Sequence, residues 1–186
     1  MMALQISKKR TLIICIPLLL LIVMLLFVPY QTALVFYKED THHIEAYLPV
    51  EAGDRFQMIY KHSIHLTDVV EKYTVLDNQT IKQYETVFEH YGIGMPENAQ
   101  GDEEFVYEDG KYHIKNMDRT FDSIDYRNGK TVSENRIIWG QNGEHFVWFN
   151  DYFEPGESLT IKIKKRSLWE YWRGVEIHEQ ETRADR

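Results

Sequence analysis

The residues best suited to chemistry lie in one stretch, Tyr60–Tyr73 (YKHSIHLTDVVEKY). His62, His65, Asp68 and Glu71 are of the types that bind metal ions or transfer protons. On a straight strand His62 and His65 point to opposite faces, so only a curled loop brings them together. The chain has no second His/Cys cluster of zinc spacing and no G-x-S-x-G or H-E-x-x-H motif. We therefore predict no catalytic residue, no metal site and no cofactor.

The polarity of the flanking residues alternates as in two strands of a hairpin. A four-residue loop at 65–68 pairs Ile64 with Val69. In the same register His62 lies opposite Glu71, and both side chains face the buried side of the sheet. The apolar residues that share this phase are Phe56, Met58, Tyr60 and Ile64 before the loop, and Val69, Tyr73 and Val75 after it.

Three interpretations of His62 and Glu71 stay open at this stage. The two residues form a hydrogen-bonded pair that fixes the register, because burying either one alone is costly. Alternatively they form a ligand- or partner-binding site, with Ser63, His65 and Asp68 at the loop rim. The third interpretation is metal binding or acid–base chemistry in a curled loop.

Two further segments are candidates for contact. Residues 90–97 (HYGIGMPE) hold two glycines and a proline, which predict a constrained turn with an apolar tip. This tip either contacts a membrane protein or packs under a neighbouring sheet. In residues 115–121 (KNMDRTF), Arg119 is a candidate partner for Glu71 or a cap for the same polar spot.

The first thirty residues predict where the protein works. Thr11–Val28 is free of charge and, as a helix, spans about 27 Å, close to the thickness of a bilayer core. Lys8, Lys9 and Arg10 precede it, which predicts a cytoplasmic N-terminus at residues 1–10 and a transmembrane anchor at 11–29. A cleaved signal peptide is the alternative, although the apolar run exceeds the roughly 7–15 residues usual for one. We expect the rest of the chain to be extracytoplasmic.

Composition limits what this outer part binds and how it is stabilised. All 29 acidic residues and all but three of the 21 basic residues follow residue 30, so the outer part carries a net charge of −11. Such a charge argues against nucleic acid as a partner, because phosphate contacts need clustered Lys and Arg. The only cysteine, Cys15, lies in the apolar run. We expect one β domain over residues 31–166, stabilised without disulfides.

Short alternating runs between turn signals predict an all-β fold, an antiparallel β-sandwich or a partly closed barrel. An Asp109-Gly110 turn pairs Glu104 with Lys115, Tyr107 with Tyr112 and Glu108 with Lys111. We also expect Asn142-Gly143 to pair Trp139 with Phe146, and Asn128-Gly129 to turn the chain back on itself. Residues 154–157 (EPGE) form a turn before a strand at 158–164. The tail, 167–186, is predicted to be a short helix or extended, with Leu168, Tyr171, Trp172 and Val175 at helical spacing.

Three motifs together resemble a bacterial family, domain of unknown function 1850. They are Y-x-H-S-[IV]-x-x-T-x-V-x-E at 60–71, G-x-G-M-P at 92–96 and N-M-x-R-x-F at 116–121. The resemblance covers most of residues 45–165. Members look like small extracytoplasmic domains, often with one N-terminal membrane segment, and their genes often adjoin those of TRAP-type transporters with TAXI-type solute-binding proteins.

This resemblance implies a non-catalytic accessory or interaction subunit of a TAXI-type TRAP transporter. The implied partners are the transporter permease or the solute-binding protein. The implied structural or contact residues are His62, Ser63, Thr67, Val69, Glu71, Gly92, Gly94, Met95, Pro96 and Arg119. The alternative function is an independent envelope ligand- or metal-binding domain that uses the neighbourhood of His62 and Glu71.

Overall fold

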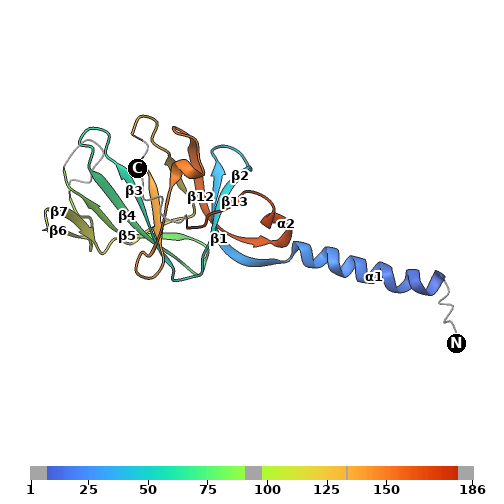
Figure 1. Ribbon diagram of the computed structural model, residues 1–186. Coiled ribbons are helices and arrows are strands. Elements are labelled where there is room, and N and C mark those ends of the chain that lie inside the picture. Colours follow the sequence, from blue (N-terminus) through green and yellow to red (C-terminus); the bar gives the residue numbers. More distant parts are fainter. Residues whose placement is uncertain (1–7, 91–97, 133, 180–186) are drawn as a thin grey trace.

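The computed structural model describes residues 8–90, 98–132 and 134–179, with side chains from residue 13 onward (Figure 1). Two sheets make up the body of the protein. The smaller sheet has the order β13 (Val175–Glu176), β2 (Ile44–Pro49), β1 (Pro29–Lys38), β12 (Ser158–Ser167), β9 (Ile124–Arg127). The larger one has the order β11 (His145–Trp148), β10 (Arg136–Trp139), β3 (Arg55–Lys61), β4 (Asp68–Val75), β5 (Ile81–Phe88), β7 (Lys111–Lys115), β6 (Glu104–Glu108). The short strand β8 (Arg119–Phe121) also pairs with β5.

The two sheets face each other across one hydrophobic core, because each strand turns every second side chain inward. Leu34 and Phe36 of β1 and Ile161 of β12 enter this core from the smaller sheet, and Met58 of β3 and Val75 of β4 enter it from the larger. All neighbouring strands are antiparallel except β13 and β2, which are parallel. The predicted all-β, antiparallel class is confirmed.

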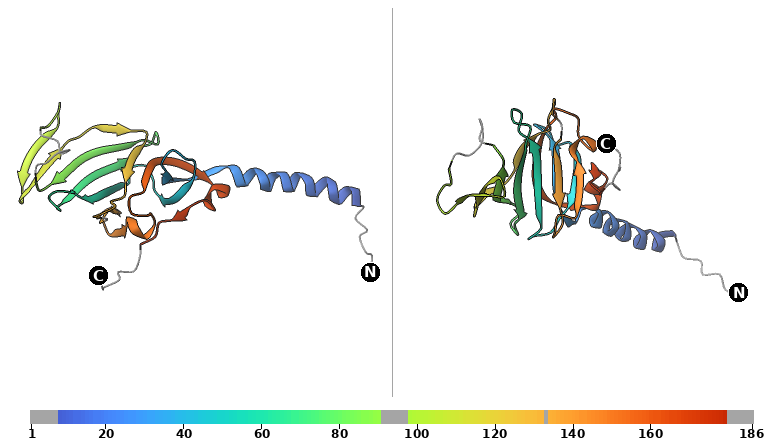
Figure 2. Two further views of the ribbon diagram at one scale, coloured as in Figure 1. Left: turned by 90° about the horizontal axis from the view of Figure 1, so that it is seen from above. Right: turned by 60° about the vertical axis from the view of Figure 1, so that its left-hand side comes forward.

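The larger sheet is longer than the smaller one. Strands β6 and β7 lie at the end of the molecule farthest from α1, beyond the cover of the smaller sheet (Figures 1 and 2). A second apolar cluster packs there around Phe88 and Ile114, with Val69, Met117, Tyr60, Phe105 and Tyr112. The larger sheet therefore holds its outer strands with a core of its own.

The β6–β7 hairpin has the predicted register. Glu104 pairs with Lys115, Tyr107 with Tyr112, and Glu108 with Lys111. Asp109 and Gly110 have φ angles of 51° and 79°, as both central residues of a type I′ turn require. The pattern was decisive here because a two-residue turn fixes a hairpin register locally.

The predicted register of the β10–β11 hairpin is wrong by one residue. Trp139 pairs with His145, not with Phe146. The loop begins at Gly140, two residues before the predicted turn, and ends at Glu144, one residue after it; Gly140 adopts a φ of 98°, which favours glycine. The Glu144 carboxylate then accepts a hydrogen bond from the Asn142 backbone N–H at 2.8 Å, which closes a five-residue loop at 140–144.

The prediction that Asn128-Gly129 forms a hairpin turn is also wrong. The strand before it, β9, pairs with β12 of the smaller sheet. The Asn128 side chain is fully buried and donates to Asn150 Oδ1 and to the backbone carbonyls of Phe153 and Glu154. Asn128 is thus an anchor between distant loops, and only the tertiary fold brings those acceptors to it.

The predicted turn at 154–157 is confirmed by a hydrogen bond from the Glu157 N–H to the Glu154 carbonyl. Strand β12 follows it, with Leu159, Ile161 and Ile163 buried. Near the end of the chain, α2 (Leu168–Tyr171) is one turn long and begins with a capping box of Ser167 and Glu170. It ends before Trp172 and Val175, so the four residues predicted on one helical face do not share a helix.

The N-terminal helix α1 (Lys8–Phe27) projects from the body (Figure 1). Its large apolar side chains from Ile13 to Phe27 are largely exposed, and Phe27 contacts Trp169 of α2 with 5.8 Å between ring centroids. Within the residues that the structure describes, no helix has both the length and the apolar character needed to cross a membrane.

The burial of Asn128 generates a prediction. Asn128→Ala removes three hydrogen bonds and leaves two carbonyl oxygens without that donor, so we expect a loss of about 2–3 kcal/mol in the free energy of unfolding. Urea unfolding measures it. The matched control is Asn142→Ala in the exposed β10–β11 loop, which should change stability by less than about 0.5 kcal/mol. Equal effects of the two variants would show that Asn128 is no anchor.

Candidate functional site

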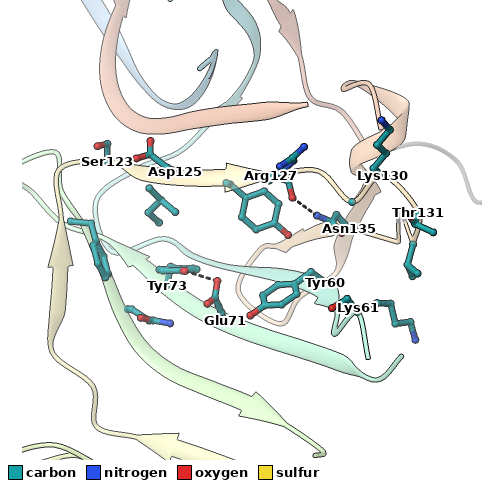
Figure 3. Close-up of a pocket in the computed structure, with 17 residues that line it drawn as sticks. Tyr60, Lys61, Glu71, Tyr73, Ser123, Asp125, Arg127, Lys130, Thr131 and Asn135 are labelled. Atoms are coloured by element: carbon teal, nitrogen blue, oxygen red, sulfur yellow. Dashed lines mark hydrogen bonds between the residues drawn. The ribbon is translucent and has the colours of Figure 1, made fainter. Parts of the chain in front are cut away.

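A cleft of about 870 Å³ opens between the sheets at one end of the core (Figure 3). Strands β3, β4 and β5 contribute Tyr60, Glu71, Tyr73 and Gln83 to its lining. The other side is formed by β9, which contributes Tyr126, and by residues 129–132 after it. The cleft therefore combines hydrogen-bonding and aromatic side chains, as ligand pockets in proteins commonly do.

Glu71 faces this cleft because of its phase on β4. Val69, Tyr73 and Val75, which lie on the same face of β4 as Glu71, are all buried. A β-bulge opposite Lys72 and Tyr73 shifts the phase of β5, so Gln83 and Thr86, three residues apart, both lie on the buried face. Gln83 donates to the Thr86 hydroxyl at 2.9 Å, which satisfies both groups within the sheet.

The Glu71 side chain is partly buried, and among the described residues its carboxylate accepts one hydrogen bond. The Tyr73 hydroxyl donates to Glu71 Oε2 at 2.8 Å (Figure 3). Burial raises the pKa of Glu71 above its usual value, and the hydrogen bond from Tyr73 offsets only part of this effect. No basic side chain among the described residues lowers this pKa. A carboxyl thus lies in the inter-sheet space with no counter-charge from the residues that the structure describes.

Three tyrosine hydroxyls surround this carboxyl. Burial and the nearby charge of Glu71 raise the pKa of Tyr60, Tyr73 and Tyr126, so all three are neutral phenols at physiological pH. The rings of Tyr60 and Tyr126 lie edge to face, with centroids 6.5 Å apart. The Tyr126 hydroxyl is buried and has no hydrogen-bond partner among the described residues.

The basic residues at the rim are turned away or already paired. Lys61 Nζ lies 3.1 Å from Asp68 and 3.6 Å from Glu134. In Figure 3 the side chains of Arg127 and Lys130 point away from Glu71. Residues 129–132 form the rim loop of the cleft. Asn135, which is buried, donates to the Arg127 carbonyl at 3.1 Å and so links the two flanks of this loop.

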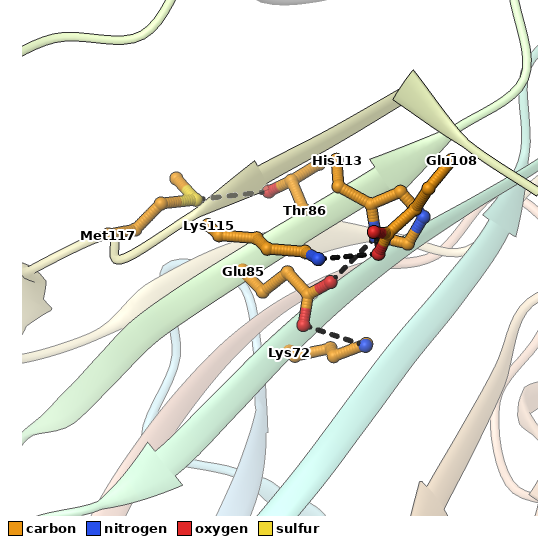
Figure 4. A network of polar contacts seen from close by, with 7 residues as sticks. All are labelled: Lys72, Glu85, Thr86, Glu108, His113, Lys115 and Met117. Atoms are coloured by element: carbon orange, nitrogen blue, oxygen red, sulfur yellow. Dashed lines mark hydrogen bonds and ion pairs between the residues drawn. The ribbon is translucent and has the colours of Figure 1, made fainter. Parts of the chain in front are cut away.

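A second glutamate, Glu85 on β5, shows how the same sheet pairs a carboxylate when its charge is compensated (Figure 4). Lys72 donates to Glu85 Oε2 at 2.8 Å, and His113 Nδ1 lies 2.8 Å from Oε1. Burial raises the pKa of Glu85, but the hydrogen bonds and charges of His113 and Lys72 outweigh it, so the net pKa lies below the usual value. In the described part of the chain, Glu71 has no basic partner of this kind.

Residues 56–146 match the family model described as domain of unknown function (DUF1850). The chain carries a DUF1850 domain. The matched segment runs from β3 into β11 and contains every residue that lines the cleft. No curated protein and no solved structure matches the chain.

The predicted pairing of His62 with Glu71 is wrong. In the DUF1850 domain Tyr60 pairs with Val69, and Met58 pairs with Glu71. The paired strands end at Lys61 and Asp68, which leaves a six-residue loop at 62–67 where we expected four residues. Because the register differs by an even number of residues, Glu71 still faces inward.

The side chain of His62 explains the longer loop. Its ring is buried, and Nδ1 accepts from the backbone N–H groups of Ile64 at 3.3 Å and His65 at 3.4 Å. The His62 N–H donates to the carbonyl of Thr67 at 2.9 Å. His62 and Thr67 therefore shape the loop, and Ile64, expected to be buried, is exposed.

The other predicted residues divide between the cleft and positions elsewhere. Ser63 and Glu71 line the cleft. Arg119 does not pair with Glu71: its Nε and Nη2 donate to the two carboxylate oxygens of Glu103 at 2.9 and 3.1 Å. The positions Gly92, Gly94, Met95 and Pro96 lie outside the described residues. Within the described part of the chain, no group of three His, Cys, Asp or Glu side chains could hold a metal ion.

Sequence reasoning missed the tyrosines and Gln83 as parts of the site. Tyr60 and Tyr73 share the phase of Glu71, so a signal for them was present but was interpreted as core packing. For Gln83 the sequence gives no clear signal, because the bulge in β5 breaks the alternation of buried and exposed residues along that strand. For Tyr126 no local pattern exists, since the pairing of β9 with β12 alone brings it over the cleft.

The opposite environments of Glu71 and Glu85 predict opposite pH effects on stability. The pKa of Glu71 is raised in the folded state. The wild type therefore has its greatest stability relative to Glu71→Gln below about pH 4.5. This relative stability falls as the pH rises from there through the folded pKa. The decline is about 1.4 kcal/mol for each unit by which the pKa is raised.

Glu85→Gln is the matched control, with the opposite sign. The pKa of Glu85 is lowered in the folded state, so the wild type is more stable than this variant above about pH 4.5 and loses that advantage as pH falls through the folded pKa. Urea unfolding at a series of pH values measures both differences. Parallel pH profiles for the two variants would contradict the assignment of an uncompensated carboxyl to Glu71.

Proposed function

We propose that this DUF1850 domain is a non-catalytic, membrane-anchored binding domain that serves solute uptake outside the cytoplasm. The observation that carries the proposal is the open cleft around Glu71. A carboxyl buried without a counter-charge costs folding free energy. Such a cost is repaid when a ligand or partner supplies the missing interactions.

The walls of the cleft favour binding of an organic molecule. Phe121 and Ile124 provide apolar surface, while Tyr60, Tyr126 and Glu71 provide directional polar groups. Few polar groups on a mostly apolar wall fix the orientation of a small ligand. The strands that carry these groups are part of the packed sandwich, so the site is largely preformed.

Attachment to a membrane is supported by the N-terminal region. Thr11–Val28 is free of charge and follows three basic residues. The apolar side chains of α1 are largely exposed, and the helix projects away from the body of the protein (Figure 1). Trp169 and Trp172 are exposed, and Trp169 contacts Phe27 at the end of α1; exposed aromatic residues of this kind favour a membrane–water interface.

The role in transport is supported by the family resemblance. Members of DUF1850 resemble accessory domains whose genes adjoin those of TAXI-type TRAP transporters. The proposed partners are the permease or the TAXI-type solute-binding protein. The second candidate function, an independent envelope ligand-binding domain, is favoured by the cleft itself, because a cleft of about 870 Å³ accommodates a small molecule without any partner protein.

Membrane attachment predicts a fractionation result. We expect the full chain to stay in the membrane fraction through alkaline carbonate and to leave it only with detergent. Replacing Leu19 and Ile22 of α1 with Asp should release the protein, because each charge at the centre of a span costs about 3 kcal/mol. The matched control replaces the same two residues with Ala and should remain bound. Release of the wild type by carbonate would overturn the anchor.

The accessory role predicts a physical partner. A pull-down of the full chain from native membranes in mild detergent should enrich a transporter permease or solute-binding protein. The control is residues 1–35 alone, which carry the proposed anchor without the body. If the full chain recovers no transporter component beyond this control, the accessory role is wrong and the independent binding domain becomes the better proposal.

A further inference from the structure

We propose that the cleft binds an organic cation by a primary ammonium group held between Glu71 and the tyrosine hydroxyls. This inference rests on the proposed binding function and names its ligand class. Three independent features of the cleft carry it: the charge of Glu71, the free acceptor atoms around it and the aromatic walls.

The first feature is charge. In the same sheet, Glu85 has Lys72 and His113 as partners, each at 2.8 Å. Glu71 receives one neutral hydroxyl at Oε2, and in the described part of the chain no basic side chain pairs with it. A cationic ligand supplies the charge that the sheet supplies to Glu85, and it converts a costly buried carboxylate into a paired one.

The second feature is the set of acceptors. Glu71 Oε1 and the hydroxyl oxygens of Tyr60 and Tyr126 are available at the cleft, and the Tyr126 hydroxyl is buried without a partner among the described residues. A primary ammonium has three N–H donors and no acceptor. Its hydrogen-bonding capacity therefore matches these three oxygens, and the Tyr126 hydroxyl gains the partner it lacks.

The third feature is the aromatic wall. Tyr60, Tyr73, Tyr126 and Phe121 all line the cleft. The faces of aromatic rings attract cations, and most strongly where water is excluded. With Ile124, these rings also provide apolar surface for the body of the ligand, so the ligand is an amine that carries a hydrocarbon chain or ring.

The other titratable groups around the cleft do not reverse its preference for a cation. Those facing the cleft from each packed element are Tyr60 and Lys61 of β3, Tyr73 of β4, Asp125, Tyr126 and Arg127 of β9, and Lys130 of the rim loop. The tyrosines are neutral, and Lys61 is paired with Asp68 and Glu134. Arg127 and Lys130 point away from Glu71 (Figure 3). Asp125, which accepts a hydrogen bond from the Thr160 hydroxyl at 3.0 Å, carries the same sign of charge as Glu71.

The test is calorimetric titration of the full chain in detergent micelles with three probes of similar size: butylammonium, butan-1-ol and butyrate. We expect butylammonium alone to bind, at millimolar concentration. Its affinity should rise as pH rises from about 5 to about 8, with protons released on binding, because the ammonium needs the ionised form of Glu71. Binding that weakens over the same pH range would overturn the inference.

Variants locate the binding. Glu71→Gln keeps the size of the side chain but removes its charge and replaces one acceptor oxygen with an N–H donor, and it should weaken butylammonium binding by about tenfold or more. Tyr126→Phe removes one acceptor and should weaken binding by a smaller factor while leaving the pH dependence intact. The control Glu85→Gln, outside the cleft, should bind like the wild type. Equal affinity of Glu71→Gln and wild type would overturn the inference.

The probes also separate this inference from the proposed function. If butyrate or butan-1-ol binds and Tyr126→Phe weakens that binding, the cleft is a ligand site but its ligand is not a cation. If no probe binds at high millimolar concentration, the ammonium inference fails; the binding function then fails with it only if the pull-down also recovers no partner.

Discussion

The period of two along β4 is the constraint on which the site depends. Tyr73 and Val75 are buried in the core between the sheets, and Val69, in the same phase, is buried in the cluster around Phe88 and Ile114. Glu71 occupies the same phase and is carried into the inter-sheet space by its neighbours. The raised pKa of its carboxyl follows from this position, because the strand phase buries Glu71 beside Tyr60, Tyr73 and Tyr126.

The contrast between Glu71 and Glu85 shows that the sheet itself does not determine the behaviour of a carboxyl. Both residues lie on adjacent central strands, and burial raises the pKa of each. What differs is the partner set: Glu85 meets a lysine and a histidine, whereas Glu71 meets a tyrosine. A polar residue that remains without compensation inside a packed fold is commonly a functional one.

The parts of this structure that sequence predicts are those fixed by neighbours along the chain. The β6–β7 hairpin follows from Asp109-Gly110 and the residues beside it. The inward phase of Glu71 follows from the alternation of β4. The pairing of His62 failed because a side chain folded back onto its own loop lengthens that loop. The role of Asn128 was predicted wrongly, and that of Tyr126 was missed, for a different reason. Their partners are distant in sequence, and the local pattern carries no information about those partners.

The junction between α1 and β1 has a mechanical consequence. α1 ends at Phe27 and β1 begins at Pro29, so a single residue separates them. β1 lies between β12 and β2 and is hydrogen-bonded to both. A pulling force applied through α1 therefore loads β1 along its axis and shears two ladders of hydrogen bonds together, instead of opening them one at a time. The helix is thus fastened to a strand that is hydrogen-bonded on both sides.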